Sequence, residues 1–136
     1  MAGRRVELFA KRTFDMTGVL AAETMTVELI DRLDVRDAER ATLLVRTHSA
    51  DFSGGGSIAV VIQQTAPSAE DPSVDFIGSD LVSTTAGSSA PSLAVAGVDL
   101  LSITTVRVVV DCTQSGGGGS LTGELSAELV LEMDDG

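Results

Sequence analysis

The strongest constraint on the fold is a strict alternation of apolar and polar residues over 121–133. Apolar or small residues occupy every second position from Leu121 to Met133, and mostly polar residues lie between them. Successive side chains of a β-strand point to opposite faces of a sheet, so a period of two over a dozen residues predicts a strand with one buried and one wet face. Such a strand needs other strands as pairing partners.

Similar strand signals recur along the chain. Further strands are predicted at 5–14, 25–31, 41–48, 57–65, 74–77, 81–84, 92–98 and 100–112. In the first two of these, the alternation places Val6, Leu8, Ala10, Met25, Val27 and Leu29 on the inward face. The strand at 57–65 is apolar on both faces, as expected of a central strand. Residues 34–40 lack alternation, and with Asp34 and Asp37 as caps they predict one helical turn.

Turn signals every ~8–12 residues separate these strands. This pattern predicts an all-β fold, an antiparallel, jelly-roll-like sandwich of about eight or nine strands. We expect the strands at 100–112 and 121–133 to pair as a hairpin, with the glycine-rich segment 115–120 as a natural, mobile loop between them. At 136 residues the chain is predicted to be a single domain, 1–136.

Composition narrows the possible partners. The net charge of −11 would repel a phosphate backbone, so no nucleic-acid partner is expected. No window approaches ~18 consecutive apolar residues, so no membrane partner is expected either. No signal peptide is recognised, and the protein is expected to be made and folded in the cytoplasm.

The sequence offers little material for catalysis. His48 is the only histidine, and the alternation of its strand places it on the face opposite Leu43 and Val45. Cys112 is the only cysteine, lies in register with buried valines and follows Asp111, which favours a buried apolar role over a reactive thiol. We therefore expect a protein that is not an enzyme.

Loop carboxylates raise the question of a calcium site. The candidates are Asp51, Glu70, Asp71, Asp75 and Asp80. They lack the short fixed spacing around a turning glycine that calcium loops use, and the glycine runs lack the Lys-Ser/Thr of a phosphate cradle. We expect no metal and no cofactor.

With no catalytic or metal-binding motif in the sequence, we expect the protein to act through contacts between its surface and other proteins. Trp and Tyr, which normally form sugar-stacking platforms, are absent. Several predicted strands carry apolar residues on the nominally outward face, namely Phe9, Ile30, Leu44, Val109 and Val130. Scattered surface aliphatics are normal in monomers, but clustered on one sheet they would form a contact surface.

Four stretches together resemble a known family. They are VELFAKRTFD, TMTVELIDRLDVRDAERATLLVRTHS, SIAVVIQQTAPSAEDPSVDFIG, and VRVVVDCTQ with ELSAELVLEM. In strand pattern and loop style the chain resembles the small β-sandwich virion proteins of tailed phages and phage-derived particles. The resemblance implies a phage-type virion structural protein, most often a capsid decoration or accessory subunit, that binds capsid or other virion proteins as a homo-oligomer in the virion.

Within this interpretation, the amino-terminal strand or arm, 1–14, is the expected partner contact. Its candidate contact residues are Arg4, Arg5, Phe9, Lys11, Arg12 and Phe14. The competing interpretation of the same segment is a solvated edge strand whose charges discourage pairing. The alternative function is a ligand-binding sandwich for glycans or a host surface, with or without calcium.

Overall fold

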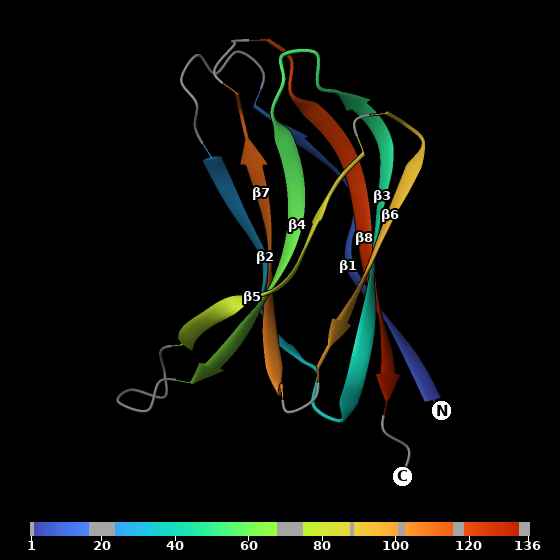
Figure 1. The fold of residues 1–136 in the computed structure, drawn as a ribbon, viewed down its shortest axis with the longest axis vertical. Helices are drawn as coiled ribbons and strands as arrows, with labels where there is room; N and C mark the ends of the chain where they lie inside the picture. The colour runs from blue at the N-terminus through green and yellow to red at the C-terminus, as the bar shows by residue number, and fades with distance from the viewer. Residues whose placement is uncertain are drawn as a thin grey trace.

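The computed structural model describes residues 2–16, 24–67, 75–87, 89–100, 103–115 and 119–133. These residues form eight strands and no helix (Figure 1). The strands are β1 (Ala2–Asp15), β2 (Thr24–Asp34), β3 (Ala38–Asp51), β4 (Ser57–Pro67), β5 (Asp75–Thr85), β6 (Ser92–Asp99), β7 (Thr105–Thr113) and β8 (Thr122–Met133). The described part of the chain has no helix long and apolar enough to cross a membrane.

The strands form two four-stranded sheets, ordered β1-β8-β3-β6 and β2-β7-β4-β5 (Figure 1). Strand β1 pairs antiparallel with β8, β2 with β7, β3 with β6 and β4 with β5. The chain is therefore one long hairpin of paired strands, rolled so that successive pairs alternate between the two sheets. This is the jelly-roll form of the β-sandwich, and the predicted fold class is confirmed.

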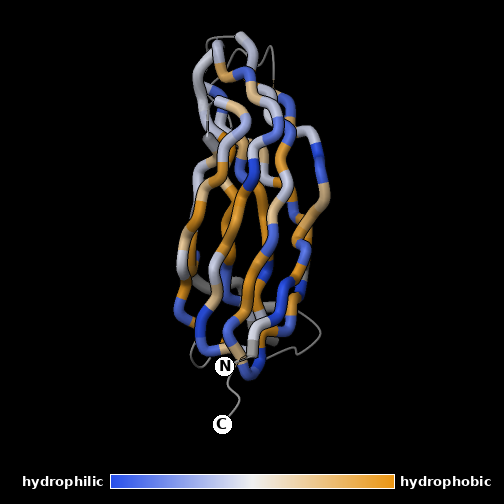
Figure 2. Tube along the Cα trace, turned by 90° about the vertical axis from the view of Figure 1, so that its right-hand side faces the viewer, coloured by the Kyte–Doolittle hydropathy of each residue, from blue (hydrophilic) through white to orange (hydrophobic). Residues whose placement is uncertain are grey.

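The core lies between the two sheets. Leu43, Leu125 and Leu129 project into it from one sheet, and Ile62 and Val108 from the other, all fully buried. Figure 2, which faces the β1-β8-β3-β6 side, shows hydrophobic and hydrophilic residues alternating along the strands. The predicted alternation of 121–133 is confirmed, since every second residue of β8 from Gly123 to Leu131 is buried.

The central position predicted for 57–65 is confirmed. Strand β4 lies between β7 and β5, and its residues are buried on both faces around Val60, Val61 and Ile62. The predicted strands at 74–77 and 81–84 fall, from residue 75 on, within a single strand, β5, and residue 74 lies outside the described residues.

The predicted hairpin between the last two strands is wrong. Strand β7 pairs with β2 and β4, whereas β8 pairs with β1 and β3 in the opposite sheet. The segment between Thr113 and Thr122 therefore crosses from one sheet to the other. Among the described strands, only β4 and β5 are both consecutive and paired in one sheet.

The predicted helical turn at 34–40 is also wrong. The backbone N–H of Ala38 donates to the carbonyl of Val35 at 3.0 Å, and Asp37 has a φ of 71°, so the chain makes a tight turn between β2 and β3. The Asp34 carboxylate accepts from the Arg36 N–H at 2.9 Å. Asp34 does cap the turn, but Asp side chains support such turns as readily as helices.

Alternation fails on the two edge strands β1 and β2. Each has two register shifts against its neighbour, between Glu7 and Arg12 on β1 and between Glu28 and Leu33 on β2. Ala10, which lies between the shifts of β1, is exposed, whereas Met25 lies before the shifts of β2, opposite Cys112, and is 37% exposed because it is at the end of the strand. Leu8 is buried as predicted, and Val6, Val27 and Leu29 are half-buried and pack against the core, which agrees with the inward face predicted for them.

The described part of segment 115–120 packs against a second glycine-rich turn. The Gly54 N–H donates to the Ser120 carbonyl at 2.9 Å, and the Ser115 hydroxyl donates to the Gly54 carbonyl at 2.8 Å. A Cβ on Gly54 would lie 2.4 Å from the backbone carbon of Gly119. Both glycines are thus required by close backbone contact. Residues 116–118, where mobility was predicted, lie outside the described residues.

Candidate functional site

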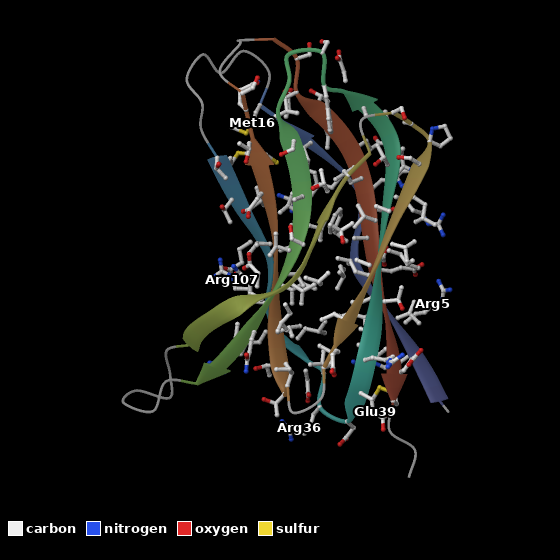
Figure 3. All side chains as sticks on the ribbon, viewed as in Figure 1. Arg5, Met16, Arg36, Glu39 and Arg107 are labelled. Carbon is white, nitrogen blue, oxygen red and sulfur yellow. The ribbon has the colours of Figure 1, made fainter. Side chains whose placement is uncertain are left out.

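The basic residues of β1 lie along one edge of the sandwich. Arg5 forms an ion pair with Glu128 of β8 at 2.7 Å. Arg4 donates to the backbone carbonyl of Asp34 at 3.3 Å. Lys11 and Arg12 are exposed near the other end of the strand. Figure 3 places Arg5 and Arg107 on opposite outer faces of the molecule. Because of its ion pair with Glu128, Arg5 already has an intramolecular partner.

The two aromatic candidates of β1 have different surroundings. Phe14 is 3% exposed and belongs to the core, so it is not part of a contact surface. Phe9 is half-buried, and its ring meets that of Phe14 edge-on at 5.7 Å between centroids. The Arg12 guanidinium lies 5.4 Å from the Phe14 ring centroid. Phe14 thus anchors β1 to the core, and only Phe9 keeps an exposed part.

Beside Phe9, the outer face of the β1-β8-β3-β6 sheet is hollowed. The hollow has a volume of about 210 Å³ and is lined by Glu7, Phe9, Leu44, Arg46, Ser126, Ala127 and Glu128. Phe9 and Leu44, two of the predicted outward apolar residues, therefore both line this hollow, and a third, Val130 of β8, belongs to the same sheet. Acidic and basic side chains border them, which is typical of the polar rim of a protein contact.

Strand β6 carries an apolar surface that was not predicted. Leu93 is 48% exposed and Val95 is 58% exposed, and both lie on the face of β6 that alternates with half-buried alanines. Val95 is the ladder partner of Leu44, so the exposed apolar surface continues from β3 onto β6. The sequence carries a signal for it, since small and larger side chains alternate from Ser92 to Ala96. That alternation alone predicts a strand and does not show which strands lie at a sheet edge.

The outer face of the β2-β7-β4-β5 sheet does not present the apolar residues that were predicted for it. Val109 and its ladder partner Val61 are 1% and 2% exposed although both alternate with core residues. Val109 was predicted to face outward and is not available for contact. Arg107 forms an ion pair with Glu28 at 3.5 Å on this face. Of the remaining outward candidates, Ile30 of β2 is half-buried and packs against the core, contrary to the prediction, and Val130 of β8 is half-buried in the β1-β8-β3-β6 sheet.

His48 lies beside a hydroxyl group. Its Nε2 is hydrogen-bonded to Ser126 Oγ at 2.8 Å, and both side chains project from the outer face of the sheet. An open hollow of about 300 Å³ next to it is lined by Arg46, Thr47, His48, Pro91, Ser92 and Leu93. Nucleophilic catalysis also needs a group that orients the histidine and donors for the oxyanion. Within the described residues, the structure joins only the histidine and the hydroxyl.

Cys112 is fully buried in the core. Burial, with a smaller contribution from the neighbouring Asp111 carboxylate, raises the pKa of its thiol to about 11. Because the thiolate is the reactive form, this side chain is unreactive at neutral pH.

Of the calcium candidates, the structure describes the side chains of Asp51, at the end of β3, and Asp80, in β5. Hydrogen bonds from Ser53 lower the pKa of Asp51, and Asp80 accepts from the Gln63 amide at 2.8 Å. Within the described residues, no group of three or more His, Cys, Asp or Glu side chains is arranged to hold a metal ion. Glu70 and Asp71, and the side chain of Asp75, lie outside the described residues.

Comparison with known proteins identifies the fold and no sequence family. No family model matches the chain, and no curated protein sequence matches it either. Among solved structures, the chain is similar to that of the infectious bursal disease virus VP2 subviral particle, with a TM-score of 0.58 and 12% identity over 96% of this chain.

Two further structures agree. The Gx and Gt strains of infectious bursal disease virus match with TM-scores of 0.56 and 0.52, at 12% and 11% identity, over 99% and 97% of this chain. The chain spans about a third of the length of these viral chains, at 32% to 33%. The fold is thus a jelly-roll sandwich of the kind found in viral capsid proteins.

Proposed function

We propose that this protein is a phage-type virion structural protein, a capsid decoration or accessory subunit. It is made in the host cytoplasm and then becomes part of the virion. There it acts by binding capsid or other virion proteins, in several copies related by symmetry. It needs no cofactor and performs no chemical reaction.

The observation that carries this proposal is the fold likeness to capsid chains over nearly the whole of this chain. Jelly rolls also occur in lectin domains and cupins, so the fold alone does not decide the function. Two features of this chain favour assembly over ligand binding. The hollows described beside Phe9 and His48 are open to solvent, and the exposed large apolar side chains of the described residues, Met25, Leu93 and Val95, lie on edge strands of the two sheets.

We place one partner contact on β1 and the hollow beside Phe9. Exposed Lys11 and Arg12 give a locally basic edge on a chain of net charge −11. An acidic patch on a capsid protein would complement that edge, and opposite charges speed association and fix its register. Phe9 supplies the apolar part of the contact.

Co-sedimentation with virion particles tests the proposal. The purified protein is mixed with particles assembled from the capsid protein encoded beside it, and bound copies are counted after sedimentation. We expect saturable binding, weakened by charge reversal in a Lys11→Glu, Arg12→Glu variant. A Thr85→Ala variant, changed at an exposed position of β5, is the control and should bind like the wild type.

The alternative, a glycan- or host-binding module, gives different results in two further assays. An assembly subunit should bind no sugar on a glycan array, and calcium should leave its melting temperature unchanged. Specific glycan binding together with failure to sediment with any virion protein would replace the proposed function with the alternative.

A further inference from the structure

The four edge strands of the sandwich are not protected equally. The edges are β1, β6, β2 and β5. Against their neighbours, β1, β2 and β5 each have two register shifts, and each carries charged residues within the strand. Bulges and charges are the usual devices that stop a strand edge from pairing with another chain.

Strand β6 has neither device. Its register with β3 runs from Ser92 to Asp99 without a shift. No charged residue and no proline occurs between Ser92 and Val98. Leu93 and Val95 are the two most exposed large apolar side chains among the described residues. A regular, neutral, apolar edge of this kind is a template for a further strand.

Gly97 lies on the same outward face of β6 as Leu93 and Val95. A Cβ built on Gly97 would have no atom within 4 Å, so nothing in this chain requires a glycine there. Glycine inside a strand weakens it and often marks a place where another chain comes close. The hollow over Gly97, of about 340 Å³, is lined by Arg40, Ala41, Thr42, Gly97, Val98, Asp99 and Glu132.

We propose that β6 pairs antiparallel with β6 of a second copy of this chain, joining the two β1-β8-β3-β6 sheets into one. The twofold axis passes beside Val95, so that Val95 faces its own copy. Leu93 of each copy then lies directly opposite Gly97 of the other copy. Directly opposed side chains share a face and nearly touch, so each leucine fills the space that each glycine leaves.

Charge favours a second copy at this edge. A chain of net charge −11 repels its copy over most of its surface, but Ser92–Val98 carries no charge. In the proposed register, Asp99 lies opposite Pro91 of the second copy, and the two Asp99 carboxylates are at opposite ends of the pairing. The contact therefore brings no like charges together.

The inference deepens the proposed function and rests on it for its biological setting, a symmetric assembly of copies. One strand edge buries less than the ~1,600 Å² of a standard interface. Self-association in solution is therefore weak and depends on concentration. Neighbouring copies held on a particle would be at a high effective concentration, which compensates for a weak contact.

Sedimentation velocity over a concentration series tests the pairing. The wild type should form a dimer, and Gly97→Val should raise the dissociation constant by ~10-fold or more, because the new side chain meets Leu93 of the second copy. Circular dichroism should show that Gly97→Val folds normally, since its Cβ has free space. Gly3→Val, on the opposite edge of the same sheet, should dimerise like the wild type.

A swap variant makes the test specific. Leu93→Gly combined with Gly97→Leu places a leucine opposite a glycine again, so the double variant should dimerise better than either single variant. Oxidation of Val95→Cys should cross-link two chains, because opposed β-strand residues lie within disulfide range. The buried Cys112 gives no competing reaction.

The results separate the two proposals. A wild type that stays monomeric up to ~1 mM overturns the β6 pairing, and so does a dimer unaffected by Gly97→Val. Either result leaves the proposed function standing if the chain still sediments with particles. If the chain dimerises as expected but binds no virion protein, the proposed function is overturned and the β6 pairing stands.

Discussion

The side-chain amide of Gln114 donates a hydrogen bond from Nε2 to the backbone carbonyl of Met16 at 3.0 Å, although the two residues are 98 positions apart. Gln114 is fully buried, and its Oε1 accepts from the Ser115 N–H at 2.9 Å. The Met16 N–H in turn donates to the Leu121 carbonyl at 2.8 Å. One amide thus joins the end of β1 to the connection that crosses between the sheets.

Replacing this amide should destabilise the fold. Gln114→Leu keeps the volume but leaves the Met16 carbonyl and the Ser115 N–H without the amide, at a cost of about 1–3 kcal/mol for buried groups. We expect the free energy of unfolding, measured by urea denaturation, to fall by that amount. Ser83→Ala, at an exposed position of β5, should leave it unchanged. Equal stabilities for wild type and Gln114→Leu would contradict this account.

A pair of glycine substitutions should have opposite effects. Gly54→Ala places a Cβ 2.4 Å from the Gly119 backbone and should destabilise by more than about 1 kcal/mol, because backbone cannot move aside cheaply. Gly97→Ala meets no atom within 4 Å and should stabilise the chain by about 0.5–1 kcal/mol, since glycine weakens a strand interior. Thermal melts of dilute protein, below dimerising concentrations, measure both. A destabilising Gly97→Ala would mean that β6 is packed more tightly than the structure shows.

The sequence predicted the strands better than their pairing. Alternation located β8 and the two-sided burial of β4, because side-chain burial repeats along a strand whatever its partner. It could not assign β7 and β8 to opposite sheets, because a strand pattern carries no information about which sheet the strand joins. Alternation also failed at Ala10 and Ile30, which lie between the register shifts of the edge strands β1 and β2.

The candidate contact residues show a similar limit. Phe14 was grouped with its basic neighbours on β1, yet it is buried in the core, as Leu8 of the same strand is. Leu93, Val95 and Gly97 were overlooked, because their meaning depends on β6 being an edge. That position follows only from the order of strands in the sheet.

Alkaline stability should report the burial of Cys112. Its thiol pKa is raised from the ordinary value of 9.0 to about 11 in the folded chain. The unfolded chain therefore loses this proton first as pH rises. The stabilisation from the protonated thiol is complete below about pH 9 and is lost as pH rises from 9 toward 11.

The measurement is urea denaturation at a series of pH values from 8 to about 11. The free energy of unfolding should decline across this range in the wild type and more gently in Cys112→Ala. The background is small, because the chain has one lysine and no tyrosine. A thiol reagent should label native Cys112 only after unfolding. Rapid labelling of the folded protein at neutral pH would show that the side chain is accessible.

The hydrogen bond between His48 and Ser126 should have no catalytic consequence. Ser126 lies within the regular ladder of β8, facing Arg46 of β3, and the adjoining hollow is open. A serine activated by histidine reacts with fluorophosphonate probes, so we expect no labelling of Ser126 detectable by mass spectrometry. We also expect the slow hydrolysis of a simple nitrophenyl ester to be the same for wild type, His48→Ala and Ser126→Ala. Probe labelling at Ser126 that disappears in His48→Ala would establish a working dyad, and the proposal of a purely structural role would then have to be abandoned.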